Sequence, residues 1–499
     1  MIINMVGGGE SEPTIVVTLS NGASGVTVTA TGMNTYTGTS DANGVANIVV
    51  TAGSYTVSAD GYFSKDVTVD KGQFNLELIY NPPLYWGVEI EESTSDPYNR
   101  VSYSATLSTG QGTYDNKAYG ATPMSGAGTS FNVGSWGTGD LAKLIEGIKP
   151  VSFDGTTWTD LDKTDETSWP STQGTDCFTE FPFRWLSITK SSGVITVVFS
   201  GEETQPDSTF QNWAFLGANG ITQRPNFHLG CYTASGTVSS HTITNGVYSQ
   251  KGSSNAVSAS LNQYWVGASR RGTEYDCLSF AMWTYIQALF LVLYKSTDSQ
   301  VAHSQGYVGG SSVQSNSAFT SYGNNYGMYG TTADTTTQNA FFWLHNLWGN
   351  MYQYSASVFT RAGSSSTPYY LKSAMSRSSN WDNSSWNSTS ILSSAKMTSK
   401  GTSSGSTGGS SGGYFTKACG SNGAGFIQSS DSGTGSSSTY YSDMSGVSVN
   451  SSYALFPMVG SSYSGSGYAG IFNAYINCVS AEEGGNRGSR LAYRGGHNY

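Results

Sequence analysis

The chain is short of charge. Only 11% of its 499 residues are charged, while 13% are aromatic and 62 are glycine. Disordered linkers carry many charges and few aromatic residues, so this composition disfavours a linker, and it is also unlike that of a typical cytosolic enzyme. The 23 basic residues against 33 acidic ones give a net charge of −10. Binding to phosphate backbones needs a basic face, so the sequence predicts no general nucleic-acid binding.

Cysteines and long apolar runs are scarce as well. The five cysteines are widely separated and form no CxxC pair: Cys177, Cys231, Cys277, Cys419 and Cys478. The opening residues MIINMVGGGESEP lack the basic and apolar regions of a secretory signal. An odd cysteine count without such a signal favours reduced thiols. The most apolar run, residues 281–294, is shorter than the ~20 residues that span a bilayer, which predicts no membrane insertion.

An all-β pattern fills residues 13–82, after a tail or attachment segment at residues 1–12. Apolar and polar residues alternate in six segments, with turn signals such as Asn21-Gly22 and Asn43-Gly44 between them: 14–19, 26–31, 46–51, 54–59, 65–69 and 74–79. Six or seven short strands in about 70 residues predict a small β-sandwich. The phrase SDANGVANIVVTAGSYTVSADGY (residues 40–62) resembles carboxypeptidase-regulatory-like, or transthyretin-like, domains. That resemblance implies a spacer or attachment module.

The character of the sequence changes after the Pro82-Pro83 linker, and we expect one large domain over residues 83–499. Strands are predicted at 85–90, 183–189 and 193–199, and a short helix at 140–147. A long helix is predicted from Cys277 to Tyr294, with Asp276 as its N-cap. Apolar residues surround this helix almost completely, so it is expected to be buried. The predicted fold class is α+β, mostly β and loops, with one long buried helix.

Three motifs in this domain carry a more specific resemblance. They are the helical segment LSFAMWTYIQALFLVLYKSTDSQ (278–300), NLWGN (346–350), and a C-terminal GYAGIFN (467–473) followed by GSRLAYR (488–494). In this order they resemble phage tail proteins with a C-type lectin fold of the formylglycine-generating-enzyme-like branch. Gly349 to Tyr354 match its hallmark strand, with tyrosines 352 and 354 in place of two tryptophans. The resemblance covers roughly residues 84–499 and implies receptor binding at a tail tip.

The C-terminal segment 455–499 is where we expect a ligand to be presented. Tyrosine with serine, glycine and asparagine is the composition of adaptable binding loops. The candidate ligand-binding residues are Ser461, Ser462, Tyr463, Ser464, Ser466, Tyr468, Ala474, Tyr475 and Asn477. Gly470, Phe472, Ile476 and Leu491 are assigned to the scaffold, since apolar positions alternate there. The resemblance implies that a retroelement can diversify this segment; a chain-wide Ser/Gly/Tyr bias is the plainer alternative.

A Ser/Gly/Thr-rich stretch at residues 361–450 precedes this segment. Low complexity by itself indicates a flexible linker. The resembled fold commonly carries long insertions here, so we expect ordered or semi-ordered loops.

An enzyme is the main alternative, either a formylglycine-type oxidase or a surface-glycan hydrolase. Cys478 alternates with its neighbours as a buried small residue would, and the five histidines form no metal-binding spacing. A hydrolase needs two carboxylates about 5–10 Å apart. The pairs Glu91/Glu92 and Glu202/Glu203 are expected to be solvated, and Glu482/Glu483 to pair with nearby arginines. The sequence therefore predicts no catalytic residues, cofactor or metal.

The expected partners follow from the same resemblance. A bacterial cell-surface receptor, glycan or protein, would bind the C-terminal segment, and phage tail proteins would bind the N-terminal region. A homo-oligomer is expected, a trimer by resemblance, located at the virion tail tip. A purely structural tail subunit remains a third possibility.

Overall fold

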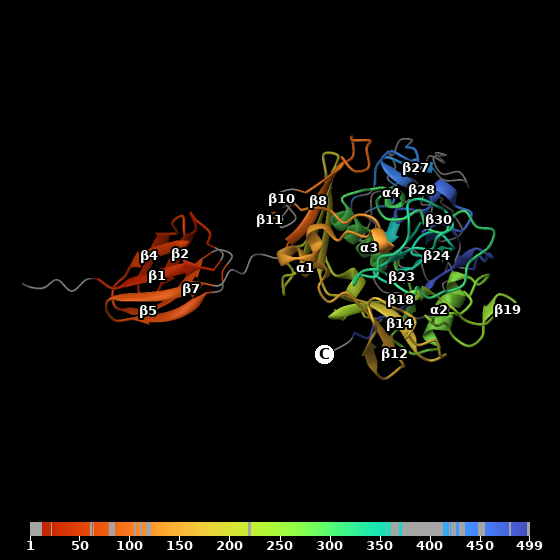
Figure 1. Ribbon diagram of the computed structural model, residues 1–499, viewed down its shortest axis with the longest axis horizontal. Helices are drawn as coiled ribbons and strands as arrows, with labels where there is room; N and C mark the ends of the chain where they lie inside the picture. The colour runs from red at the N-terminus through yellow and green to blue at the C-terminus, as the bar shows by residue number, and fades with distance from the viewer. Residues whose placement is uncertain are drawn as a thin grey trace, which may run out of the picture. The chain divides into compact units, whose positions relative to one another are not determined.

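The computed structural model of the chain divides into two compact units, Met1–Leu84 and Tyr85–Tyr499 (Figure 1). The structure describes residues 12–20, 22–59, 64–78, 85–103, 121–217, 221–356, 435–447, 455–478 and 481–496, with short pieces at 62, 106–109, 112–115, 358–360, 369–371, 413–418, 420 and 426–428. Strands predominate over helices in these residues, so the mostly-β prediction is confirmed. In the same part of the chain, no helix is long and apolar enough to cross a membrane.

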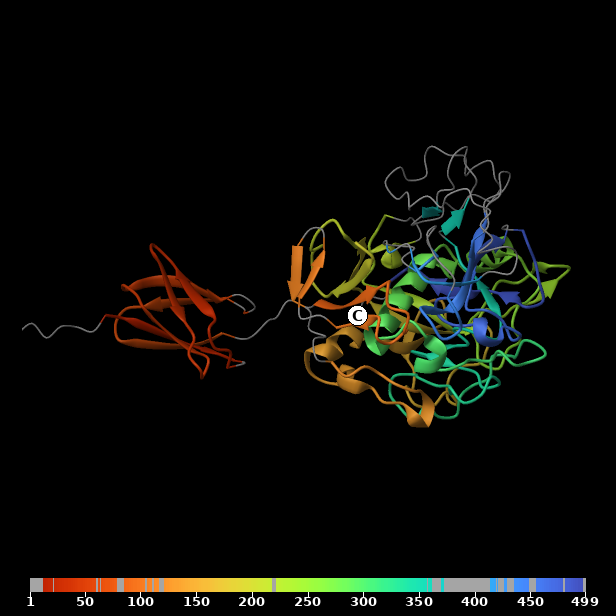
Figure 2. The ribbon, with the colours of Figure 1, turned by 90° about the horizontal axis from the view of Figure 1, so that it is seen from above.

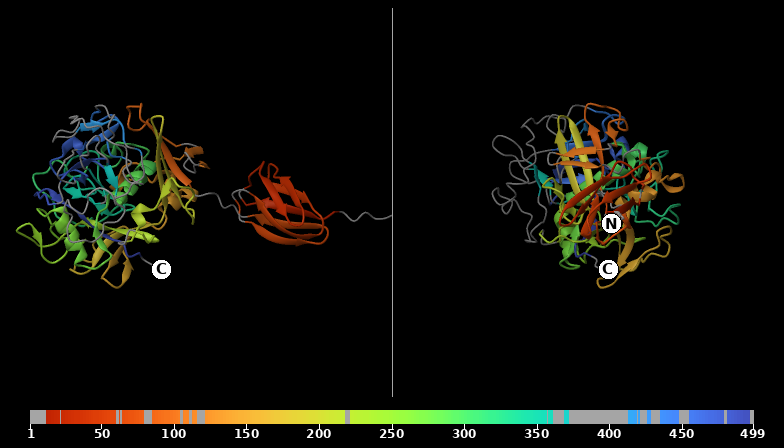
Figure 3. Two further views of the ribbon diagram at one scale, coloured as in Figure 1. Left: turned by 180° about the vertical axis from the view of Figure 1, so that it is seen from behind. Right: turned by 90° about the vertical axis from the view of Figure 1, so that its left-hand side faces the viewer.

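The first unit consists of two sheets packed face to face (Figure 2 and Figure 3). One sheet has the order β4 (Val45–Val49), β1 (Thr14–Leu19), β7 (Gln73–Leu78). The other has the order β3 (Thr35–Thr39), β2 (Thr27–Thr31), β5 (Gly53–Ala59), β6 (Lys65–Val69). Alternate residues such as Ile15, Val17, Val28 and Val57 are fully buried between them. Burial of each such side chain contributes about 1.5–3 kcal/mol.

Each of the six predicted segments overlaps one of these strands, and β4, β5 and β7 begin one residue earlier than predicted. The strand without a predicted counterpart is β3, whose sequence TYTGT has no buried residue. It pairs with β2 over its whole length, Thr27 opposite Thr39 to Thr31 opposite Thr35. Backbone pairing, rather than apolar alternation, defines β3.

Three sheets form the frame of the second unit. The first has the order β13 (Trp158–Asp160), β12 (Lys149–Phe153), β14 (Asp176–Pro182), β18 (Asn226–Thr233), β32 (Arg490–Tyr493), β21 (Tyr275–Cys277). The second has the order β17 (Phe210–Gln211), β15 (Trp185–Ser191), β16 (Val194–Ser200), β8 (Tyr85–Glu91), β9 (Val101–Ser102). The third has the order β27 (Gly413–Phe415), β28 (Tyr441–Val447), β30 (Ala474–Cys478), β29 (Phe456–Val459), β24 (Tyr352–Tyr354), β31 (Arg487–Gly488). The C-terminal segment thus contributes β29, β30 and β31 to the third sheet and β32 to the first.

Short strand pairs complete the described β-structure: β10 (Thr106–Thr109) with β11 (Gly112–Asp115), β19 (Val238–Ser239) with β20 (Thr242–Ile243), β22 (Ala340–Phe341) with β23 (Leu344–His345), and β25 (Val358–Thr360) with β26 (Tyr369–Leu371). The predicted 361–450 insertion contributes β26, β27 and β28, and most of its remainder lies outside the described residues.

The long helix α3 spans Phe280–Tyr294, and all of its residues are buried. The predicted start at Cys277 with Asp276 as N-cap is wrong. Ser279 is the N-cap, and its side chain accepts a hydrogen bond from Met282 N–H (3.2 Å). Tyr275–Cys277 is instead strand β21 beside β32, and the Asp276 carboxylate pairs with Arg494 (3.0 Å).

Three further α-helices occur in the described residues. Helix α1 (Gly139–Ile145) matches the predicted short helix. Helix α2 (Leu261–Ser269) was not predicted, and helix α4 (Ser299–Ala302) follows α3 directly, after an N-cap at Asp298.

Arg490 fixes the closing strand from inside the core. Its side chain is fully buried and donates to the carbonyl oxygens of Gly230 (2.7 Å), Cys231 (2.8 Å) and His345 (2.5 Å), and to Gln353 Oε1 (3.0 Å). Among the described residues no carboxylate pairs with it, and burial lowers the pKa of Arg490 to about 9. The guanidinium therefore ties β32 to β18, β23 and β24.

Candidate ligand-display loop

The predicted binding segment folds as two antiparallel strands joined by a long loop. Strands β29 and β30 pair from Phe456 opposite Cys478 to Val459 opposite Ala474, with a register shift between Phe456 and Pro457. The intervening residues 460–473, here called the display loop, contain a short 3₁₀ helix, η4 (Ser466–Tyr468). The Gly460 N–H donates to the Asn473 carbonyl oxygen (3.2 Å), which closes the loop at its base.

The Gly349–Asn350 turn holds the first part of the display loop. The Gly349 N–H donates to the Gly460 carbonyl oxygen (2.7 Å), and the Tyr463 N–H donates to the Asn350 carbonyl oxygen (2.9 Å). Both turn residues have positive φ, 75° and 58°, a conformation that glycine and asparagine adopt most readily. Two motifs more than 100 positions apart in sequence are thus joined directly.

The middle of the display loop is held by the 308–310 segment and by α4. The Gly310 N–H donates to the Tyr463 carbonyl oxygen (2.9 Å), and the Ser466 N–H donates to the Val308 carbonyl oxygen (3.3 Å). From α4, which Figure 1 labels next to β28, Gln300 Nε2 donates to the carbonyl oxygens of Ser466 (3.2 Å) and Ala469 (2.6 Å). One amide side chain therefore bridges both ends of η4.

The side chains of Ser299 and Asp443 hold the last part of the display loop through hydrogen bonds. The Ile471 N–H donates to Ser299 Oγ (3.0 Å), and the Phe472 N–H donates to Asp443 Oδ2 (2.7 Å). Burial, and then the nearby Asp298 carboxylate, raise the pKa of Asp443 well above its ordinary value. A Cβ atom on Gly470 would lie 2.0 Å from Asp443 Oδ1, so only glycine fits above this carboxyl group.

In each of these hydrogen bonds to the rest of the chain, the group that the display loop contributes is a backbone N–H or carbonyl group. The N–H or carbonyl groups of residues 460, 463, 466, 469, 471 and 472 make the contacts, whatever their side chains are. A loop held in this way keeps its path when its outward side chains change.

The nine candidate binding residues fall into three groups by exposure. Ser464, Ser466 and Tyr468 are exposed, and the Tyr468 side chain is 45% accessible. Tyr463 and Asn477 are half-buried. Ser461, Ser462, Ala474 and Tyr475 are buried. The proposed contact surface is therefore restricted to the first two groups.

Burial of the last group has plain causes. Ser461 and Ser462 lie at the anchored base of the loop, and Ala474 opens the paired strand β30. Tyr475 packs edge-on against Tyr352, with ring centroids 6.0 Å apart. The four scaffold residues, Gly470, Phe472, Ile476 and Leu491, are buried as predicted.

Tyr414 is a contributor that the sequence did not indicate. It lies in β27, inside the Ser/Gly-rich stretch. Its hydroxyl donates to the Gly467 carbonyl oxygen (3.2 Å), and its ring centroid lies 6.1 Å from that of Tyr468. No periodicity around residue 414 links it to the C-terminal segment, so only the fold reveals the contact.

Neither a protein-family model nor a curated protein matches this sequence. The function is therefore inferred from the geometry of the described residues.

Three of the six acidic residues considered for catalysis contact basic side chains. The expectation that Glu92 is solvated is wrong, because it is buried, pairs with Lys190 (2.7 Å) and accepts from the Ala418 N–H (2.9 Å). Glu482 pairs with Arg487 (2.5 Å), as predicted, whereas Glu483 pairs with His241 (2.7 Å).

Four of the five cysteines, and His345, also lie in the core. Cys478 is buried, as predicted, and so are the free thiols of Cys177, Cys231 and Cys277. Cys419 lies outside the described residues. His345 is fully buried, contacts Glu166, and lies with Nε2 2.9 Å from the Tyr322 hydroxyl.

Proposed function

We propose that this protein is a phage tail-tip or tail-fibre receptor-binding protein, which presents the display loop to a bacterial surface receptor. The observation that carries the proposal is that backbone groups hold the display loop in place while its side chains remain free to contact a ligand. Backbone groups fix residues 460–473, while Tyr463, Ser464, Ser466 and Tyr468 turn side chains toward the surface. Tyrosine offers a rigid amphipathic contact area, and serine offers adaptable hydrogen bonds.

Anchoring through backbone groups also supports a surface whose residues vary. Because the anchors are backbone groups, we expect substitutions at 463, 464 and 468 to leave the loop path unchanged, whereas the positive φ of Ser466 (46°) restricts the residues that fit there. This is what diversification by a retroelement requires. A near-copy of the 3′ end of the gene beside a reverse transcriptase, differing mainly at adenines, would establish it; without one, a fixed specificity stands.

Attachment and valency complete the proposal. The first unit and residues 1–12 would bind phage tail proteins, and several copies, a trimer by resemblance, would act at one tail tip. Multiple weak contacts then combine through avidity, so each copy needs only modest affinity. The receptor would be a surface glycan or protein.

The test compares two exposed tyrosines. Fluorescently labelled protein is incubated with a panel of intact bacterial strains, and the strain that retains it is used to compare variants. Tyr468→Ala should lower cell binding at least tenfold, about the effect of an interface hot spot. Tyr98→Ala is the matched control, because Tyr98 is 47% exposed, close to the 45% of Tyr468, but lies outside the display loop.

Two results would overturn the proposal. One is retention by no strain in the panel, and the other is equal loss for Tyr468→Ala and Tyr98→Ala. Release of sugar from the cell surface, abolished by one Glu or Asp substitution, would instead support the hydrolase alternative.

A further inference from the structure

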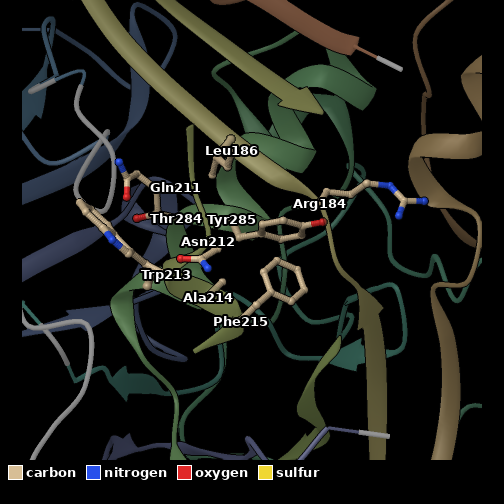
Figure 4. Close-up of a pocket in the computed structure, with 10 residues that line it drawn as sticks. Arg184, Leu186, Gln211, Asn212, Trp213, Ala214, Phe215, Thr284 and Tyr285 are labelled. Atoms are coloured by element: carbon tan, nitrogen blue, oxygen red, sulfur yellow. The ribbon is translucent and has the colours of Figure 1, made fainter. Parts of the chain in front are cut away.

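The cavity at the start of α3 is too small to take part in receptor binding. It lies where the 3₁₀ helix η3 (Trp213–Phe215) meets the first turns of α3, and it is lined by Phe215 and Tyr285, whose ring centroids are 5.2 Å apart (Figure 4). Its volume of about 20 Å³ is room for one water, which needs roughly 10–15 Å³. A sugar ring or a receptor side chain does not fit there, so any contact beyond the display loop has to be made at the surface.

A short turn of the chain lies beside the display loop. Residues 436–439, here called the serine turn, lead into β28, which pairs with β27 (Figure 1). The Thr439 N–H donates to the Ser436 carbonyl oxygen (3.1 Å), and the Ser436 N–H donates to Thr439 Oγ1 (2.8 Å). Just before the turn, the Gly435 N–H donates to the Tyr414 carbonyl oxygen (2.9 Å). The serine turn is therefore closed by its own hydrogen bonds and fixed to β27.

The serine turn touches the display loop at Gly467. A Cβ atom on Gly467 would lie 3.7 Å from Ser437 Cβ and 3.5 Å from the Tyr414 hydroxyl oxygen, which is van der Waals contact. The Tyr414 hydroxyl also donates to the Gly467 carbonyl oxygen, and its ring lies beside that of Tyr468. The display loop and the serine turn thus form one continuous surface, joined through Tyr414.

The serine turn adds exposed hydroxyl groups to the display loop. Ser437 and Ser438 are both exposed. Neither has a positive φ, so each position accepts other side chains without backbone strain. Together with the exposed residues of the display loop they form what we call the extended surface: Ser437, Ser438, Ser464, Ser466 and Tyr468. Serine hydroxyl groups surround a single exposed aromatic ring in this surface.

The extended surface carries no charge. Residues 435–440 and 463–469 contain no acidic residue, lysine, arginine or histidine. The carboxyl groups of Asp443 and Asp298 lie in the interior, where they are 0% and 5% exposed. An anionic ligand would therefore meet no cation in these two segments, and a cationic ligand would meet no exposed carboxylate. Charge attraction, which recruits charged polymers to patches of opposite sign, has no source here.

We infer that the serine turn and the display loop together bind a neutral glycan, an inference that rests on the receptor-binding function proposed above. A sugar ring has an apolar face that packs on the Tyr468 ring, and hydroxyl groups that exchange hydrogen bonds with the serines. A protein receptor fits this surface less well, because protein interfaces have an apolar core built from several large side chains. Among the described residues of the two segments, Tyr468 is the only exposed large apolar side chain.

The first test places opposite charges at one exposed position of the serine turn. Ser437→Lys and Ser437→Glu introduce side chains of similar length, and binding is measured with labelled full-length protein on the strain that retains it. With a neutral glycan, both variants should weaken binding about tenfold and to the same extent, because each fills space that the sugar occupies. Raising the salt concentration from about 0.05 M to about 0.5 M should change binding of the natural chain less than twofold.

Control variants separate this effect from folding and from charge elsewhere. Ser171 is also exposed and lies outside both segments, so Ser171→Lys and Ser171→Glu should bind as the natural chain does. Both Ser437 variants should melt at the temperature of the natural chain, because the side chain is exposed and the backbone conformation accepts them.

The second test treats the bacterial cells instead of the protein. Periodate cleaves the vicinal diols of sugars, so treated cells should lose at least nine-tenths of their capacity to retain the protein, about a tenfold effect. Cells treated with a protease should keep that capacity. The same cells, mock-treated, give the reference value.

Several results would overturn the inference. Loss of binding after protease but not after periodate would assign a protein receptor. Strong salt dependence, or stronger binding by one Ser437 variant and weaker binding by the other, would assign a charged receptor. Full binding by both Ser437 variants would exclude the serine turn from the contact surface, and the proposed function would still stand if Tyr468→Ala lowers binding. Retention by no strain would overturn the inference and the proposed function together.

Discussion

The Asp443 carboxyl group makes loop anchoring sensitive to pH. Its folded-state pKa is raised by burial and then by Asp298, so the folded state binds this proton more tightly than the unfolded state. The stabilising contribution is fully present below the unfolded pKa of about 3.9 and is lost as the pH rises through the folded pKa. We expect Asp443→Asn, which keeps an oxygen for the Phe472 N–H, to gain stability relative to the natural chain as the pH rises from about 4. Urea unfolding of the second unit across this range measures the difference.

Asp334→Asn is a control of opposite sign. Asp334 lies near the surface, and hydrogen bonds from the Thr336 N–H and neighbouring groups lower its pKa. The ionised Asp334 carboxylate stabilises the folded state above the unfolded pKa, and this stabilisation is lost as the pH falls. Asp334→Asn should therefore lose stability relative to the natural chain as the pH rises. A stability difference between Asp443→Asn and the natural chain that stays constant with pH would contradict the assignment.

Predictions for single residues succeeded where burial follows from the local alternation of apolar and polar residues. They failed where contacts with residues distant in the sequence determine burial and pairing. Phe472 and Ile476 are buried because apolar residues alternate around them. Glu92 was expected in solvent, because the sequence does not show that Lys190 and Ala418 meet it. Arg490 is one of the arginines near Glu482 and Glu483 in the sequence, yet backbone carbonyl groups from two other strands surround it.

Helix α4 acts on the display loop through a single side chain, Gln300. Gln300→Ala removes the donors to the Ser466 and Ala469 carbonyl oxygens. Each such bond contributes about 0.5–1.5 kcal/mol, so opening of η4 should become roughly tenfold more frequent. Hydrogen exchange, followed by mass spectrometry, should show faster exchange confined to amides near residues 464–472.

Gln305→Ala is the matched control for this prediction. Gln305 also donates from its amide to a backbone carbonyl oxygen, that of Thr332 (2.7 Å), which lies outside the display loop. Its loss should leave exchange at 464–472 unchanged. Equal exchange in both variants would mean that α4 does not hold the loop.

Element-level predictions show the same division between local and distant information. Strands with a clear period of two were found almost to the residue, as Lys65–Val69 shows. The start of α3 was misplaced by three residues, because Tyr275–Cys277 is drawn into the sheet by pairing with β32, far along the chain. The turn at Gly349–Asn350 was recognised from its motif, but its hydrogen bonds to Gly460 and Tyr463 depend on tertiary structure.

At the scale of the whole molecule, each unit has a hydrophobic core of its own. The first unit closes around residues such as Ile15, Val28 and Val57, and among the described residues the core clusters of the second unit begin at Tyr85. We therefore expect two calorimetric transitions in the full chain, reproduced by the separate fragments 1–84 and 85–499. An interface worth about 1 kcal/mol would shift the melting temperature of a domain of the smaller size by about 4–8 °C. If the melting temperature of each fragment agrees with that of the same unit in the full chain more closely than this, the two units fold independently. A larger difference would contradict independent folding.

Under the proposed function, fragment 85–499 should also retain all of the cell binding, and fragment 1–84 none.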